Sequence, residues 1–212
     1  MKYTIIFFDI DNTLYPQDCG LWNTINERVN GFIQKRLNVP REEISALRDY
    51  CRQSFGTTLS GLMNKFDFDA EEYLTYIYDI DLSEYLQPDW QTREILLQYP
   101  QRKIIFTNAS RNHALRVLSA LKLNNIFERI IDIHNFYPYN KSQKEAFETA
   151  FRIMGLSEYK KCVLVDDMVK VLDIAKNFDM YTICINKEPP PREGNHVFIH
   201  EVKELPLVLS PD

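Results

Sequence analysis

Residues 4–16 read TIIFFDIDNTLYP, an apolar run that leads into two aspartates, Asp9 and Asp11. The run is short, β-branched and aromatic, and it is apolar on both faces, which is typical of a strand buried inside a parallel sheet. Open parallel sheets bind ligands beyond the carboxyl ends of their strands, and the two aspartates fall at that end. The stretch therefore predicts a buried strand that delivers two carboxylates to a site.

Further apolar runs of the same kind follow along the chain. They lie at residues 103–107, 129–133, 162–165 and 181–185. Helical patterns separate them, at residues 110–121, 142–154 and 169–178, with Gly155 placed to end the second. This alternation predicts the α/β class with a doubly wound parallel sheet. In the tail, residues 197–199 indicate an edge strand and the prolines at 189–191 a stiff loop.

The segment between the first two runs has a different pattern. It carries long helical stretches and no clear strand; the stretches cover residues 22–37, 42–55 and 70–80. We therefore expect an inserted helical cap over residues 16–88, with the α/β core built from residues 1–15 and 89–212.

Composition limits the partners. The 212 residues include 25 basic and 30 acidic ones, for a net charge of -5, so no global positive field attracts nucleic acid polymers or anionic membranes. No apolar run approaches the roughly 18 residues of a membrane span, and the N-terminus begins with a strand pattern. The four cysteines form no C-x-x-C pair, which favours free thiols. These features predict a cytoplasmic protein; they set no oligomeric state.

The pair Asp9 and Asp11 allows three interpretations. Asp and Asn are common in solvated turns, and the motif alone fits that interpretation as well as any other. A calcium loop starts similarly, but Leu14 stands where that loop needs glycine and no helix precedes Asp9. The third interpretation is a nucleophile with its proton-transfer partner, which a phosphatase requires as two separate carboxylates.

More candidate site residues stand at the ends of later runs. The second run ends in Thr107 and Asn108, which could hold phosphate oxygens ahead of a helix or could simply cap it. Lys141 precedes another helix. The fourth apolar run ends in Asp166 and Asp167, whose charges repel each other unless a cation or hydrogen-bond donors are present. A magnesium site explains that pair economically.

Together these motifs resemble those of the haloacid dehalogenase superfamily. FFDIDNTLYP at residues 7–16 is similar to motif I, and its LYP ending is similar to the pyrimidine 5′-nucleotidase branch. Thr107 stands at motif II, Lys141 in KSQKEAF at motif III, and Asp166 with Asp167 at motif IV. The predicted cap lies between motifs I and II, where that superfamily carries its cap. The ordered set is far more specific than any one motif.

The resemblance implies a magnesium-dependent phosphomonoester hydrolase. Asp9 is then the nucleophile that forms an aspartyl-phosphate, and Asp11 is the general acid and base. The resemblance further implies that Asp9, the Asp11 main-chain carbonyl and Asp167 hold Mg²⁺, with Asp166 acting mostly through water. It implies that Thr107, Asn108 and Lys141 bind the phosphate. Asp11 also favours phosphoryl transfer over carbon–halogen cleavage, because a halide leaves without a proton.

The chain departs from the family pattern at a few positions. Met168 stands where a small residue is usual, and Val171 where Asn is usual. Ser142 and Lys144 replace common prolines of motif III. These departures affect the surroundings of the site and its rate, whereas the groups expected to touch phosphate and metal are present.

The expected substrate is a nucleoside 5′-monophosphate, with pyrimidines favoured, on the strength of the branch resemblance. Aromatic residues of the cap could stack on a base, although residues at helical spacing more often form a core; they are Trp22, Phe55, Phe66, Phe68, Tyr73, Tyr76 and Tyr78. A sugar-phosphate phosphatase or phosphomutase of the same fold is the nearest alternative. A catalytically silent phosphate-binding protein or a receiver-like signalling module is the alternative of another class.

Overall fold

The computed structural model describes residues 2–189 and 195–211. Its strands form one parallel sheet in the order β3-β2-β1-β4-β5-β6. They are β1 (Ile5–Phe8), β2 (Arg102–Phe106), β3 (Arg129–Ile131), β4 (Cys162–Asp166), β5 (Tyr181–Ile185) and β6 (Val197–Ile199). The predicted doubly wound parallel sheet is confirmed. Because the strand order reverses beside β1, the carboxyl ends of β1 and β4 meet at the point where such sheets bind ligands.

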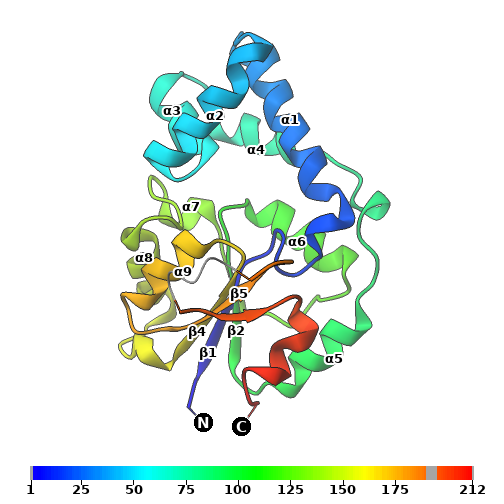
Figure 1. Ribbon diagram of the computed structural model, residues 1–212, viewed down its shortest axis with the longest axis vertical. Coiled ribbons are helices and arrows are strands. Elements are labelled where there is room, and N and C mark those ends of the chain that lie inside the picture. The colour runs from blue at the N-terminus through cyan, green and yellow to red at the C-terminus, as the bar shows by residue number, and fades with distance from the viewer. Residues whose placement is uncertain (1, 190–194, 212) are drawn as a thin grey trace.

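Helices cover both faces of this sheet. In Figure 1, α8 (Lys144–Met154) and α9 (Val169–Lys176) lie on one side, and α5 (Trp90–Gln98) and α6 (Arg111–Ala120) on the other. Burial on both faces explains why β1 is apolar at every position, since all four of its residues are buried. Gly155 ends α8 with a φ of 65°, as its position in the sequence predicts.

Four helices stand apart from the sheet, above the carboxyl ends of its strands (Figure 1). They are α1 (Leu21–Arg36), α2 (Arg41–Phe55), α3 (Thr58–Lys65) and α4 (Ala70–Tyr78). Phe32 forms the centre of this group, and its ring contacts those of Phe68, Tyr73 and Tyr76 at 5.1 to 5.6 Å. All four helices fall inside residues 16–88, and the proposed boundaries of cap and core remain a prediction. We refer to α1 to α4 as the cap helices.

Sequence patterns did not indicate every element. Three helices were not predicted: α3, which follows its N-cap Thr57, α5, which follows its N-cap Asp89, and the short α7 (Ile133–Phe136). The strand predicted at residues 129–133 stops at Ile131, because Asp132 caps the short helix α7 (Ile133–Phe136). Short 3₁₀ segments complete the chain at Gln17–Cys19, Leu82–Glu84, Tyr159–Lys161 and Val202–Leu207. Most of the proline loop predicted at 189–191 lies outside the described residues.

The four cysteines are free thiols, as predicted, and three of them are buried. Within the described ranges of the chain, no helix has both the length and the apolar character needed to cross a bilayer.

Candidate active site

The first predicted carboxylate directly follows β1. The Asp9 backbone N–H donates to the carbonyl of Val165 in β4 at 3.0 Å, which places Asp9 where the two strands end. The chain then turns through Asn12, whose φ is 60°, a left-handed conformation that Asn adopts more readily than most residues. This turn directs Asp11 into the same cavity as Asp9. The pair predicted from the sequence thus converges on one site.

An acidic cluster forms at the ends of β1 and β4. One carboxylate oxygen from each of Asp9, Asp166 and Asp167 lies within 4.8 Å of the others. Asp166 is fully buried and accepts a hydrogen bond from the Met168 N–H at 2.9 Å. Asn12 donates from Nδ2 to Asp167 at 3.4 Å. Three carboxylate oxygens at this spacing match the oxygen ligands that Mg²⁺ prefers, so the donor set fits that ion.

Lys141 supplies the positive charge inside this cluster. Its Nζ lies 2.7 Å from Asp9 Oδ1 and 2.5 Å from Asp166 Oδ2, and the residue is 2% exposed. Burial would lower the pKa of Lys141, but the charges of Asp166 and Asp9 outweigh that effect and raise it. Lys141 therefore stays an ammonium ion. Since Met168 and Lys141 occupy both oxygens of Asp166, Asp9 and Asp167 are better placed to contact a metal directly.

The acidic cluster is not fully neutralised by Lys141. Burial raises the pKa of Asp9 to about 7; Lys141 opposes that shift, and the charge of Asp166 adds to it. Burial, together with the charges of Asp166 and Asp9, raises the pKa of Asp167 well above its usual value. Both shifts arise from burial and then from neighbouring like charges, and a bound divalent cation would offset them.

Asp11 lies in a different electrostatic environment. Tyr15 Oη donates to Asp11 Oδ1 at 2.8 Å, and His113 Nε2 lies 2.8 Å from the same oxygen. Burial would raise the pKa of Asp11, but the charge and hydrogen bond of His113 and the hydrogen bond of Tyr15 together lower it. The two carboxylates of motif I thus have pKa values shifted in opposite directions.

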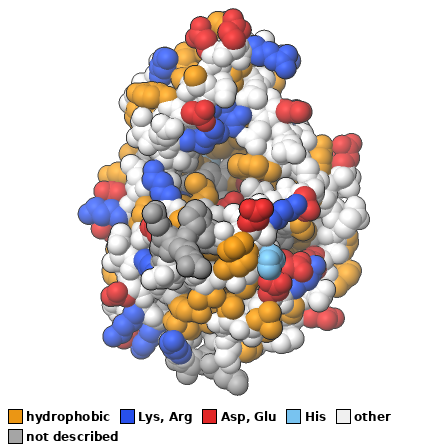
Figure 2. All heavy atoms as spheres, viewed as in Figure 1, with side chains coloured by type: hydrophobic (Ala, Val, Ile, Leu, Met, Phe, Trp, Pro, Cys, Tyr) orange, Lys and Arg blue, Asp and Glu red, His pale blue; other side chains and the backbone are white. Residues whose placement is uncertain are grey.

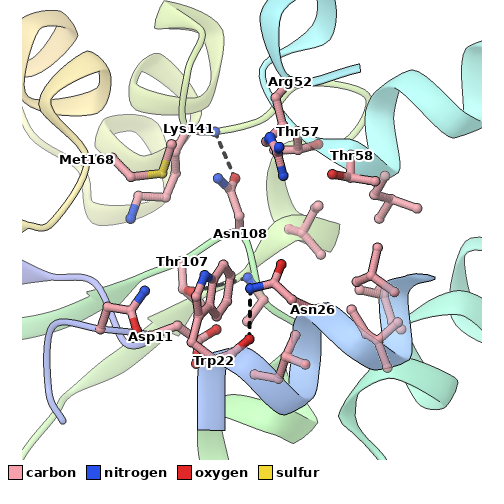
Figure 3. A pocket seen from close by; sticks show the side chains of 18 of the residues that line it. Asp11, Trp22, Asn26, Arg52, Thr57, Thr58, Thr107, Asn108, Lys141 and Met168 are labelled. Carbon is pink, nitrogen blue, oxygen red and sulfur yellow. Dashed lines mark hydrogen bonds between the residues drawn. The ribbon is translucent and has the colours of Figure 1, made fainter. Parts of the chain in front are cut away.

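Thr107 and Asn108 follow β2 on the other side of β1. Thr107 is 1% exposed, and its Oγ1 accepts a hydrogen bond from the Ala109 N–H at 3.1 Å. The Asn108 side-chain oxygen accepts from the Lys141 backbone N–H at 2.9 Å (Figure 3). Asn108 therefore fixes the Lys141 backbone, a role that the sequence did not predict. Both residues line the same cavity as Asp9.

A cavity of about 360 Å³ connects these groups with the cap helices. Its core end is lined by all the predicted site residues except Asp166. Its cap end is lined mainly by apolar residues, together with polar groups; the polar groups are Asn26, Arg48, Arg52, Thr57 and Thr58. Figure 2 shows the hollow between the cap helices and the sheet, and Figure 3 shows Trp22, Asn26 and Arg52 extending from cap helices toward it.

Three of the cap aromatics line the cavity: Tyr73 and Tyr78, which are buried, and Trp22, which is 38% exposed. Sequence reasoning also missed three groups around the carboxylates: Tyr15, His113 and the amide of Asn12. A lone histidine on a helical pattern gives no sign that its partner lies 102 residues earlier in the chain.

Comparison with known proteins decides the family. The family described as haloacid dehalogenase-like hydrolase matches residues 3–179. The chain belongs to the haloacid dehalogenase-like hydrolases. Members of this family act on small molecules and usually use a divalent metal, and this chain has a cluster of three aspartates that could hold one.

A curated relative and two solved structures illustrate the similarity. Phosphate metabolism protein 8 of Saccharomyces cerevisiae is 27% identical over 97% of this chain and 72% of its own length. The magnesium-bound HAD-hydrolase YfnB of Bacillus subtilis superposes with a TM-score of 0.65 at 15% identity, covering 99% of this chain and 100% of that one. A HAD phosphatase of Thermococcus onnurineus superposes with a TM-score of 0.63 at 19% identity, covering 99% of each chain.

The similar structures also include haloacid dehalogenases. At these identities the likeness shows the fold, and the bond that is cleaved has to be argued from the side chains of this site.

Proposed function

We propose that this haloacid dehalogenase-like hydrolase is a magnesium-dependent phosphomonoesterase that acts through an aspartyl-phosphate on Asp9. The observation that carries the proposal is the second carboxylate, Asp11, which lines the same cavity as Asp9 and is held by two hydrogen-bond donors on one oxygen. An alkoxide leaving group needs a proton, whereas a halide does not. A second buried and oriented carboxyl group beside the nucleophile, which can carry a proton to the leaving oxygen, therefore favours phosphate-ester cleavage over carbon–halogen cleavage.

In the first step, an Asp9 oxygen attacks phosphorus in line while the ester P–O bond breaks. The protonated form of Asp11, which its lowered pKa makes the minor form, transfers its proton to the departing oxygen. Lys141 and Thr107 stabilise the negative charge on the remaining phosphoryl oxygens. A Mg²⁺ ion held by Asp9 and Asp167, with the Asp11 carbonyl, would neutralise charge between the carboxylate and the phosphate.

In the second step, Asp11 takes a proton from water as the water oxygen attacks the phosphorus of the aspartyl-phosphate. The Asp9–phosphorus bond breaks and inorganic phosphate leaves. One carboxyl group serves as acid and then as base, so each turnover returns Asp11 to its starting protonation state. The lowered pKa of Asp11 suits the second role, because the ionised form is the base.

The cap end of the cavity supports a nucleoside as the leaving group. Trp22 offers an exposed ring for stacking, and apolar residues surround it. Arg48 donates to Asn30 Oδ1 at 2.7 Å and contacts Asn26, while its buried Nε has no partner among the described residues. Arg48 and Arg52 line this end of the cavity, and their guanidinium groups can donate to a ring carbonyl, which pyrimidines and guanine carry. We propose nucleoside 5′-monophosphates as substrates, with pyrimidines favoured; the name of the yeast relative, a protein of phosphate metabolism, is consistent with a phosphate ester.

The test is a panel of phosphate esters assayed at one magnesium concentration. UMP, CMP, AMP, GMP, ribose 5-phosphate and glucose phosphates are compared by kcat/KM for phosphate release. We expect the highest values for UMP and CMP, because contacts in the cap cavity help to orient phosphorus at Asp9. Faster turnover of the sugar phosphates would reject the nucleotidase assignment and keep the phosphatase mechanism. Release of halide from a 2-haloacid without phosphatase activity would reject both.

A further inference from the structure

His113 lies deep between the sheet and the cap helices. It is the third residue of α6, and its side chain is 0% exposed. The N-cap Ser110 accepts a hydrogen bond from the His113 N–H at 3.3 Å, which fixes the start of the helix and the position of the imidazole. The imidazole reaches Asp11, not a backbone group, so its orientation is tied to the carboxylate.

Both hydrogen bonds to Asp11 end on the same oxygen. Tyr15 Oη and His113 Nε2 each lie 2.8 Å from Oδ1, and no described residue donates to Oδ2. Oδ1 accepts hydrogen bonds both in the ionised carboxylate and in the acid that carries its proton on Oδ2, so His113 donates from Nε2 in either state. The Nδ1 atom is buried and has no partner among the described residues. A buried nitrogen without a hydrogen-bond partner lowers the stability of the fold. Packing alone therefore does not explain why this histidine makes a single hydrogen bond, and that bond goes to Asp11.

Tyr78 covers the imidazole. Its ring stacks on His113 with 3.8 Å between centroids and 15° between planes. Tyr78 is the last residue of α4, and its carbonyl accepts from Arg116 Nη1 at 2.6 Å, one turn further along α6. Tyr15 precedes the cap helices in the chain and Tyr78 ends them. The chain thus enters the cap helices after Tyr15, which contacts Asp11, and leaves them at Tyr78, which contacts His113.

We propose that His113 is a positioning residue, which together with Tyr15 pins Asp11 Oδ1 and leaves Oδ2 as the oxygen that exchanges the proton. This inference rests on the proposed phosphatase function. As the ester P–O bond breaks and the Asp9 oxygen–phosphorus bond forms, the proton on Oδ2 passes to the leaving oxygen. Without His113, the carboxyl group rotates and presents Oδ2 less often in line with that oxygen.

The test separates proton transfer from stability by varying the leaving group. Rates of Asp9 phosphorylation are measured in single turnovers for an alkyl phosphate and for p-nitrophenyl phosphate, whose leaving group needs little protonation. We expect His113→Leu to slow the alkyl phosphate about 10- to 100-fold, which is part of the roughly 10²- to 10⁴-fold that general acid catalysis contributes, and to slow the aryl phosphate less than about 3-fold. His113→Gln, which still offers a side-chain N–H, should recover most of the loss. His200→Leu, at an exposed histidine, is the matched control.

A double-mutant cycle with Asp11→Asn completes the design. If His113 acts through Asp11, adding His113→Leu to Asp11→Asn should change the alkyl-phosphate rate little further. Additive losses, or equal losses for both leaving groups, would overturn the inference. Should His113→Leu not yield folded protein, Tyr78→Ala removes the stacked ring instead, and its rates with the alkyl and the aryl phosphate are compared in the same way. Failure of the wild-type protein to release phosphate from any ester would instead reject the proposed function.

Discussion

Lys141 Nζ lies 2.5 Å from Asp166 Oδ2, and both side chains are almost completely buried. The same ammonium group lies 2.7 Å from Asp9, so a single cation bridges carboxylates from the ends of β1 and β4. Breaking a buried pair by removing one partner leaves an uncompensated charge, which costs about 3–5 kcal/mol. Lys141 therefore affects both the fold and the proposed phosphoryl transfer.

Lys141→Met should lower the free energy of unfolding by a few kcal/mol in metal-free protein, within the range for broken buried pairs. It should also lower kcat/KM about 100-fold or more, because one donor to the transferring oxygens is lost. Urea unfolding and phosphate release measure the two effects. Lys144→Met is the control, since that lysine is 67% exposed. Similar small effects of both substitutions would contradict the assignment.

Asp9→Asn and Asp11→Asn should fail in different ways. Asp9→Asn removes the nucleophile, so no phosphorylated protein should form with any ester. Asp11→Asn removes proton transfer alone, so aryl phosphates should still phosphorylate Asp9 while alkyl phosphates do so about 10² to 10⁴ times more slowly. Mass spectrometry after rapid quenching detects the aspartyl-phosphate. The assignment of roles would be wrong if Asp11→Asn slowed both esters equally.

Parts of this architecture follow from local sequence and parts do not. The strands and the carboxylates that follow them were predictable, because apolar runs such as Ile5–Phe8 and Cys162–Asp166 need both sheet faces covered. The helix α3 was missed, since its packing depends on Gly61, where a Cβ would lie 2.4 Å from the Cβ of Cys51. Only the tertiary fold places those two residues together.

The surroundings of Asp11 were unpredictable for the same reason. His113 and Tyr78 are separated along the chain by 35 positions and meet only because α4 ends over α6. Phosphate binding by Asn108 stays a prediction, and its side-chain oxygen also accepts a hydrogen bond from the Lys141 N–H, which the sequence did not indicate. Residue type indicated the chemistry that each side chain can perform, whereas its partner is set by tertiary packing.

Metal and pH should act on stability through the same acidic cluster. The pKa of Asp9 is about 7 in the metal-free folded protein against a usual 3.8. Between those values the unfolded chain releases the proton while the folded chain keeps it, so stability should fall as pH rises from about 4 to 7. Mg²⁺ binding competes with that proton and should raise Tm more at pH 8 than at pH 5.

Thermal unfolding at pH 5, 6, 7 and 8, with EDTA and with Mg²⁺, measures how Tm changes with pH and how much Mg²⁺ raises Tm at each pH. Asp167→Asn should reduce the pH slope and the Mg²⁺ effect, because it removes one charge from the cluster. An equal rise in Tm at pH 5 and pH 8, or undiminished turnover in excess EDTA, would reject the metal site.

The loop after α2 is hydrogen-bonded to the loop that carries Lys141. Asn140 is fully buried and donates from Nδ2 to the Phe55 carbonyl at 2.7 Å. Gly56, with a φ of 84°, leaves room for this contact, since a Cβ there would lie 2.6 Å from Asn140 Oδ1. That oxygen cannot easily move, because it accepts the Ser142 N–H at 3.0 Å.

Gly56→Ala should therefore displace Asn140, loosen the cap helices and lower kcat/KM about 10-fold or more through misplacement of Lys141. Gly155→Ala is the matched control: its φ is also positive, at 65°, but no atom lies within 4 Å of the added Cβ. Both substitutions carry the left-handed backbone cost of about 1–2 kcal/mol, so both should lower Tm. If Gly155→Ala reduced kcat/KM as much as Gly56→Ala, the loss would stem from general destabilisation.

The chain has two tryptophans, both partly exposed and differently placed. Trp22 is 38% exposed and lines the cavity, whereas Trp90 is 58% exposed on α5, outside the cavity lining. Stacking of a base on an aromatic side chain contributes roughly 1–3 kcal/mol, which corresponds to about 5- to 150-fold in an equilibrium constant. Trp22→Ala should therefore lower kcat/KM for UMP and CMP within that range.

The matched substitution Trp90→Ala should leave kcat/KM for both nucleotides within about 2-fold, because surface changes away from a site have small effects. For glycerol phosphate, whose leaving group carries no ring, Trp22→Ala should also have little effect. Comparing Trp22→Ala with Trp90→Ala separates stacking from a general loss of stability. Comparing nucleotides with glycerol phosphate separates stacking from the phosphoryl-transfer chemistry. Equal losses on nucleotides and on glycerol phosphate would mean that Trp22 supports the cap helices and does not contact a base, and the nucleoside would then have to bind elsewhere in the cavity.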